Sequence, residues 1–222
     1  MTSIFETAVG ADFDRLHPML QRRFRVGLDS GEACIGHGVM HRIRRGPWWT
    51  VPFLQVGRMR NILIPDVGSD VPFTIQNYPY VDPMGRETVT FVRDCAVGSK
   101  HSRFDATMIL VDGRLVDYLG THQHLAVDLS MHVEDDGALV LTSDEQRFYE
   151  GRLGFRFPML FSGRARLREW FDDGDQLFHV DLEVRNSVFG FLFGYTGAFA
   201  CEWVPAMDAP EGLKPVRHEA RT

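Results

Sequence analysis

Two Asp-Gly dipeptides constrain the fold of this chain more than any other feature of the sequence. Asp112-Gly113 and Asp173-Gly174 each lie between segments in which apolar and polar residues alternate. A dipeptide of this kind between strand-like segments is typical of a two-residue type I′ hairpin, because both turn positions need a positive φ angle. A looser turn signal spans Glu134 to Gly137. The sequence therefore predicts consecutive antiparallel hairpins.

Segments with strand character recur along most of the chain. Strands are predicted at about 31–43, 71–80, 87–97, 103–111, 114–119, 122–133, 138–148, 163–171, 176–186 and 188–203. The connections are mostly short, which favours an up-and-down meander. Closing such a sheet removes its exposed edges. We therefore predict a mainly β protein, an antiparallel up-and-down meander that forms a lipocalin-like (calycin-like) barrel.

The N-terminal segment has a different period. Apolar residues recur there at three- and four-residue spacing: Ile4, Phe5, Ala8, Val9, Phe13, Leu16, Met19, Leu20 and Phe24. This spacing predicts one or two amphipathic helices that cover one face or end of the sheet, the second beginning at Pro18. The arginines that follow, Arg22, Arg23 and Arg25, are interpreted as a solvated last helical turn.

The first predicted strand alternates from Ala33 to Ile43, which puts all its odd-numbered residues on one face. At 222 residues, a chain of this type commonly forms one domain. We expect a single barrel domain over 1–204, including the N-terminal helices. Residues 205–222 contain three prolines and few large apolar residues, which predicts a flexible C-terminal tail.

Charge and cysteine content exclude several classes of function. With 24 basic and 30 acidic residues the net charge is −6, so we expect no nucleic-acid partner. The three cysteines, Cys34, Cys95 and Cys201, are odd in number and lack CxxC spacing, which indicates free thiols in the reducing cytoplasm. Glycines interrupt the longest apolar run, 188–203, and the N-terminus does not resemble a secretion signal, so no membrane span is predicted.

Three sequence segments together resemble a known family: DRLHPMLQRRF near the start, GRARLREWFDDGDQLFHVDLEV at 163–184, and FGFLFGYTGAF just after, at 189–199. The chain resembles a bacterial family of domains of unknown function that is also found fused C-terminal to saccharopine-dehydrogenase-like reductase domains. The resemblance is clearest over the last third of the chain. It implies a shared fold and an accessory role beside small-molecule enzymes, and it supplies no catalytic residues.

The hairpin around Asp173-Gly174 yields the first candidate site. A two-residue turn there places Arg168 opposite His179, Arg166 opposite Asp181 and Arg164 opposite Glu183. Opposite charges on one face favour an exterior ladder of ion pairs. A patch that binds phosphate or carboxylate is the alternative.

The opposite face of the same hairpin is apolar except for Glu169. A carboxylate among apolar groups needs a partner or a raised pKa. Glu169 is therefore the candidate catalytic residue, as an internal acid/base or a ligand anchor. The alternative is that Glu169 lies in water at the barrel mouth.

Other side chains are candidates for ligand binding. They are Tyr195, Phe191, Phe193, Asp117, Tyr118 and Phe178. The faces of the 114–119 strand are too alike to show whether Asp117 or Tyr118 points inward. For the aromatic residues around Tyr195, core packing is the competing interpretation.

His122, His124 and Asp128 form a possible metal site, because an HxH pair can bring two imidazoles to one ion. The apolar face of this strand is the natural inward one, so a polar stripe in solvent is preferred and no metal is predicted. No phosphate-binding loop, nucleophile elbow or dinucleotide fingerprint is present, so no cofactor is predicted.

These features predict a barrel whose cavity binds a small, mostly apolar molecule. The alternative is an isomerase or cyclase that acts on such a molecule with an interior acid/base. A structural or interaction module is the third reading. The oligomeric state is left open by the sequence.

Overall fold

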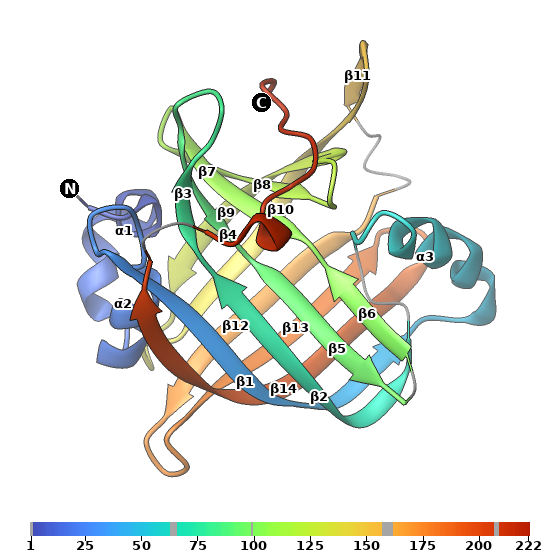
Figure 1. Cartoon of the computed structure of the whole chain (residues 1–222). Helices are drawn as coiled ribbons and strands as arrows, with labels where there is room; N and C mark the ends of the chain where they lie inside the picture. Colours follow the sequence, from blue (N-terminus) through green and yellow to red (C-terminus); the bar gives the residue numbers. More distant parts are fainter. Residues whose placement is uncertain (1, 63–65, 99, 157–161, 207–208) are drawn as a thin grey trace.

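The computed structural model describes residues 2–62, 66–98, 100–156, 162–206 and 209–222. The α-helices occupy the two ends of the molecule, and a short 3-10 helix (Glu211–Leu213) lies over the side of the barrel (Figure 1). At one end lie α1 (Ile4–Val9), the 3-10 turn Gly10–Arg15 and α2 (Pro18–Phe24), and at the other lie the 3-10 turn Trp48–Thr50 and α3 (Val51–Arg58). Ser3 caps α1 by accepting a hydrogen bond from the Glu6 N–H at 3.1 Å. Pro18 begins α2 as predicted.

The rest of the described chain is mainly strand. The strands are β1 (Glu32–Arg45), β2 (Gly68–Asn77), β3 (Pro79–Val81), β4 (Glu87–Thr90), β5 (Val92–Val97), β6 (Lys100–Phe104), β7 (Ala106–Val111), β8 (Arg114–Leu119), β9 (Leu125–Val133), β10 (Leu139–Glu150), β11 (Leu153–Arg156), β12 (Arg164–Asp172), β13 (Leu177–Asn186) and β14 (Gly190–Pro205). All pairs are antiparallel, which confirms the predicted fold class.

One long hairpin connects the two ends of the sheet. The strand order is β3-β4-β7-β8-β9-β10-β12-β13-β14-β1-β2-β5-β6, with β11 against β10. Single residues separate β4 from β5 and β6 from β7. The register continues across both breaks, since Thr90 lies opposite Thr107 and Arg93 lies opposite Phe104. Because β5 also pairs with β2 and β7 with β8, this hairpin joins the ends and the sheet curls into a barrel (Figure 1).

The structure contains one of the two predicted two-residue Asp-Gly turns. At the β7–β8 turn, Asp112 and Gly113 both have positive φ (50° and 75°), which confirms the predicted hairpin. At the β12–β13 turn the prediction is wrong, because the loop spans 173–176 and the residue with positive φ is Gln176 (60°).

Side-chain hydrogen bonds explain the longer loop between β12 and β13. Asp172 accepts from the Gly174 N–H at 2.7 Å, and Asp175 accepts from the Leu177 N–H at 3.0 Å. Aspartates that bond the backbone two residues ahead stabilise such turns in place of a two-residue connection. The four-residue loop changes the strand register by two residues.

The ion ladder predicted on this hairpin is corrected accordingly. Arg166 lies opposite Glu183, and Arg168 lies opposite Asp181. The guanidinium groups instead contact the β9–β10 turn, where both arginines bond Glu134, at 2.9 and 2.6 Å, and Arg168 also bonds Asp136. Since a shift by an even number preserves the faces, these arginines stay outside and Glu169 stays inside.

The faces of β1 also differ from the prediction. Cys34, Met40 and Ile43 are buried in the main core, whereas His37 and His41 are exposed. The register shifts between Val39 and Arg42, which indicates a β-bulge. A bulge adds one residue to a strand and reverses the alternation beyond it. Ile43 therefore points inward, although it shares the odd-numbered series with His37 and His41.

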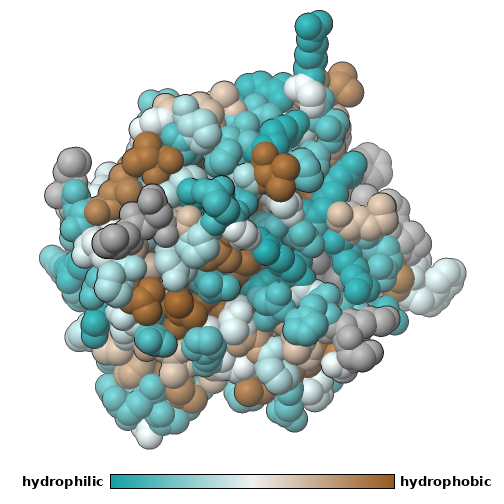
Figure 2. Space-filling model, viewed as in Figure 1, coloured by the Kyte–Doolittle hydropathy of each residue, from teal (hydrophilic) through white to brown (hydrophobic). Residues whose placement is uncertain are grey.

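The segment after β14, for which we expected a flexible tail, contacts the outside of the barrel. Ala209 and Leu213 are buried with Tyr80 in a small apolar cluster. Further along, Tyr118 donates a hydrogen bond to the Arg221 carbonyl oxygen at 2.7 Å. Away from such contacts the visible surface is mostly hydrophilic, with hydrophobic residues in small separate areas (Figure 2).

Candidate functional site: a cavity inside the barrel

A cavity of about 270 Å³ lies inside the barrel. Its lining is mostly apolar, with Leu54 from α3 and Ile62 after it at one end and strand residues around the wall. The wall includes Phe104, Met108, Leu119, Leu125, Val127, Leu129, Leu141, Ala165, Leu167, Leu182, Val184, Leu192 and Phe193. The predicted inward orientation of the apolar face of 122–133 is confirmed, because Leu125, Val127 and Leu129 line this space.

The segment that follows α3 connects the parts of the barrel near this cavity. The Asp105 N–H donates to the Asn61 carbonyl oxygen at 2.8 Å, and the Asn61 side chain donates to the Thr121 hydroxyl at 2.7 Å. Asp105 separates β6 from β7, and Thr121 lies in the β8–β9 turn. These contacts hold Ile62 in place against the cavity.

Five polar side chains also line the cavity, and two of them already serve the fold. Ser143 accepts a hydrogen bond from the Ala165 N–H at 2.7 Å, and Gln146 donates to the Gly163 carbonyl oxygen at 2.7 Å. Arg93, Asp117 and Tyr195 are the other three. Within the described part of the chain, the Asp117 Oδ1 atom is buried without a hydrogen-bond partner.

Strand alternation brings these three groups into the interior. Asp117 lies between Leu115 and Leu119 on the inward face of β8, so the choice that the sequence left open is decided for Asp117. Arg93 shares the inward face of β5 with the core residue Cys95. Its guanidinium lies over the Phe104 ring at 5.2 Å from the centroid, a cation–π contact.

Burial controls the protonation of Asp117. The loss of hydration on burial raises the pKa of Asp117 to about 7, against the opposing effect of the Arg93 charge. Burial also raises the pKa of the Tyr195 hydroxyl. At neutral pH, Asp117 can thus either donate or accept a proton, while Arg93 supplies hydrogen-bond donors in the same cavity.

Comparisons with known proteins place this barrel in a family. Residues 16–199 match the family described as "Domain of unknown function (DUF4166)". The chain belongs to this family. It is also similar to the "Uncharacterized protein YndH" of Bacillus subtilis (strain 168), with 29% identity over 201 residues, which covers 90% of this chain and 97% of that protein. A domain-of-unknown-function family was expected, and the fusion to reductase domains stays a prediction.

Three of the candidate binding residues line the cavity in this DUF4166 domain: Asp117, Phe193 and Tyr195. Tyr118 and Phe178 do not. Tyr118 points to the outer face beneath the C-terminal segment, and Phe178 stacks on Phe199 in the core, with centroids 5.5 Å apart. The sixth, Phe191 on β14, lines a separate open hollow of about 450 Å³ together with residues of β1 and of the start of β2.

The prediction that Glu169 reaches the cavity is wrong. The Glu169 side chain is 3% exposed, and its Oε1 atom accepts a hydrogen bond from the Nε atom of Arg23 at 2.5 Å. Arg23 is 1% exposed, so it is not part of a solvated helical turn. The carboxylate has the partner that its burial requires, and that partner is a structural one. A catalytic role for Glu169 stays an untested prediction.

Arg93 lines the cavity, and the sequence analysis did not identify it as a candidate. Its signal is the alternation in Phe91-Val-Arg-Asp-Cys95, which puts Arg93 on one face with Phe91 and Cys95. Phe91 and Cys95 are both buried in the main core. An arginine in the middle of such a face is a candidate for the same reason as Glu169, because a buried charge of either sign needs a partner.

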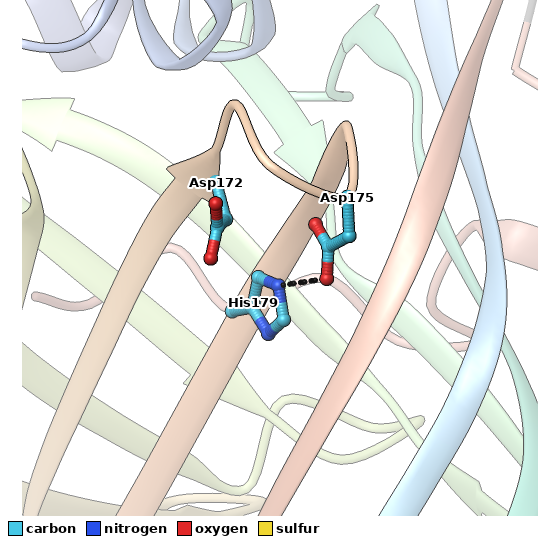
Figure 3. A group of neighbouring side chains, drawn as sticks. All are labelled: Asp172, Asp175 and His179. Carbon is cyan, nitrogen blue, oxygen red and sulfur yellow. Dashed lines mark hydrogen bonds and ion pairs between the residues drawn. The ribbon is translucent and has the colours of Figure 1, made fainter.

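The described residues contain one group of three side chains that could ligate a metal ion: Asp172, Asp175 and His179 at the β12–β13 turn (Figure 3). Asp175 contacts His179 at 3.0 Å, and both aspartates accept backbone hydrogen bonds within the loop. The loop geometry accounts for this cluster.

The histidines of the possible metal site noted in the sequence, His122 and His124, stack on each other beside Phe148. Among the described helices, none is long and apolar enough to cross a membrane.

Proposed function

We propose that this barrel binds a small, mostly apolar molecule in the cavity and orients it through Asp117, Arg93 and Tyr195. The unpartnered Oδ1 atom of Asp117 is the observation that carries the proposal. A buried polar atom without a partner destabilises a fold, so it is retained where a ligand or ordered water completes it. The surrounding wall is predominantly apolar, as in most sites for small molecules.

The lining indicates the chemistry of the ligand. The apolar part of the ligand would pack against the leucines of the cavity wall, while a polar group at one end would hydrogen-bond with Arg93 and Asp117. Arg93 donates to a carbonyl or carboxylate oxygen, and Asp117 exchanges hydrogen bonds with a hydroxyl or an enol. The volume of about 270 Å³ lies just below the usual range for ligand pockets. The ligand is therefore small.

We further propose that binding takes place in the cytoplasm, where free thiols such as Cys34, Cys95 and Cys201 persist.

An isomerase or cyclase is the second candidate function. The raised pKa of Asp117, about 7, favours it, because a general acid/base works best when its pKa is close to the working pH. In this version Asp117 takes the role that the sequence suggested for Glu169. Arg93 would stabilise negative charge that develops on a substrate oxygen.

Mass spectrometry of small molecules released from the undenatured, purified protein tests the binding proposal. The wild type should release a defined apolar compound. Ala165→Phe fills the cavity and should abolish its retention, and Asp117→Asn should weaken it. Asp181→Asn is the matched control, because Asp181 is exposed on β13 and should leave retention unchanged. Unfolding in urea verifies that each variant is folded.

The same variants separate binding from catalysis. If the compound is a substrate, prolonged incubation with the wild type converts it to an isomer, and Asp117→Asn binds it without converting it. Unchanged retention in a folded Ala165→Phe variant would contradict the cavity as the site. A wild-type protein that carries no compound and binds no apolar probe would favour a structural module instead.

A further inference from the structure

A second buried polar cluster lies at the α2 end of the barrel and takes no part in the proposed binding site. Its centre is the Arg23 guanidinium, whose Nη1 atom lies 3.3 Å from the Cys34 sulfur and 3.6 Å from the Cys201 sulfur. The same nitrogen donates to the Asn77 side-chain oxygen at 2.9 Å. Two thiols thus share one cation.

Strand pairing holds the two cysteines together. Cys34 on β1 lies opposite Trp203 on β14, and Gly36 lies opposite Cys201. Cys34 and Cys201 are therefore diagonal neighbours on one face of adjacent strands. Both sulfurs lie within 3.6 Å of the same Arg23 nitrogen. Cys34 is fully buried, and Cys201 is partly exposed, so a small reagent approaches the pair from the Cys201 side.

The surroundings favour a thiolate at Cys34. The neighbouring Cys201 thiol, whose effect outweighs that of burial, and the charge of Arg23 lower the pKa of the Cys34 thiol to about 7. Glu169, the other charged group beside the pair, raises the pKa of Cys34. Cys95 is the internal contrast, because burial raises the pKa of its thiol to about 12.

We propose that Cys34 and Cys201 form a redox-active pair that a hydroperoxide oxidises to a reversible disulfide between β1 and β14. The Cys34 thiolate attacks the peroxide oxygen, the O–O bond breaks, and Cys34 becomes a sulfenic acid while hydroxide or alkoxide leaves and takes up a proton. The Cys201 thiol then attacks the Cys34 sulfur, the S–S bond forms, and water leaves. A dithiol reductant reverses the bond by thiol exchange.

Oxidation of the full-length protein by hydrogen peroxide tests this proposal. Intact mass measurement should show the loss of two hydrogen atoms, and peptide mapping should identify a bond between Cys34 and Cys201 that dithiothreitol reverses. Cys95→Ser is the matched control and should oxidise as the wild type does. Cys34→Ser and Cys201→Ser should each form no intramolecular disulfide.

A second measurement separates activation by Arg23 from mere proximity of the sulfurs. The paired variant Arg23→Gln with Glu169→Gln removes both charges while keeping similar shapes. Its thiol oxidation at neutral pH should slow roughly ten-fold and its pH profile should shift upward, because the thiolate is the reactive form. Three outcomes would overturn the proposal: free thiols after oxidation, reaction of Cys95 at the same rate, or an unchanged pH profile in the paired variant.

Discussion

The Nε atom of Arg23 in α2 donates a hydrogen bond to Oε1 of Glu169 in β12 at 2.5 Å, and neither side chain is more than 3% exposed. The two residues are 146 positions apart in the chain. Burying either charge alone would be costly, so the pair ties the N-terminal helices to the barrel wall.

We expect removal of one partner to destabilise the protein far more than removal of both. Glu169→Gln and Arg23→Met should each lower the free energy of unfolding by about 3–5 kcal/mol, because each leaves a buried polar or charged group uncompensated. The double variant Arg23→Met with Glu169→Met should lie closer to the wild type. Urea unfolding of the four proteins measures this cycle, and simple additivity of the two single changes would argue against a coupled pair.

The stability of the protein should depend on pH through Asp117. The pKa of Asp117 is raised from 3.8 in the free residue to about 7 in the folded protein. At a pH between these two values the folded protein holds a proton on Asp117 that the unfolded chain has lost. The contribution of Asp117 to the free energy of unfolding is therefore fully present at a pH below 3.8. It is lost as pH rises through about 7, by up to ~4 kcal/mol.

Asp117→Asn should remove this pH dependence. Urea unfolding of the wild type and the variant, repeated from pH about 4.5 to about 7.5, measures it. The wild type should lose stability relative to the variant as pH rises. A difference that is constant over this range would mean that Asp117 has an ordinary pKa.

The conformation of the β12–β13 loop leads us to expect that substitution at Gln176 destabilises the protein more than substitution at Gly174. Gln176 adopts the left-handed conformation, so Gln176→Val should cost about 1–2 kcal/mol through steric strain at a β-branched residue. Gly174 does not have a positive φ, and a Cβ there would approach only the Asp172 side-chain oxygen, at 3.0 Å. Gly174→Ala should therefore cost less than about 0.5 kcal/mol. Thermal unfolding of both variants tests the loop, and the reverse order would support a two-residue Asp173-Gly174 turn.

Deletion of residues 209–222 tests whether the C-terminal segment belongs to the folded domain. The deletion removes the hydrogen bond from the Glu219 N–H to the buried Gln123 side chain, at 2.6 Å, and exposes Tyr118. We expect a loss of about 2–4 kcal/mol in the free energy of unfolding, mostly from exposed aromatic surface. Hydrogen exchange of the intact protein should show protection at Val216, whose N–H donates to the Thr121 carbonyl oxygen at 2.8 Å. An unchanged unfolding curve would identify a dispensable tail.

Local sequence signals determined the fold class and several faces of the strands. The alternation of apolar and polar residues marks the two faces of a strand and does not depend on the register of its pairing. Glu169 was therefore assigned to the interior correctly, although the predicted hairpin register was wrong by two residues. Asp112-Gly113 specified its turn because both backbone conformations depend on these two residues alone. The helical period at the N-terminus likewise predicted helices at one end of the barrel.

Only the tertiary structure decided which buried charge meets which partner and where space remains. Glu169 and Asp117 are both carboxylates on inward faces, yet Arg23 reaches Glu169 from a distant helix while Asp117 keeps an oxygen free toward the cavity. Pairing between positions far apart in the chain depends on the curvature of the sheet, on the bulge in β1 and on how the helices pack against the barrel ends. A periodic pattern specifies the direction of a side chain, but close packing in three dimensions determines whether that side chain meets an ion, a filled core or a cavity.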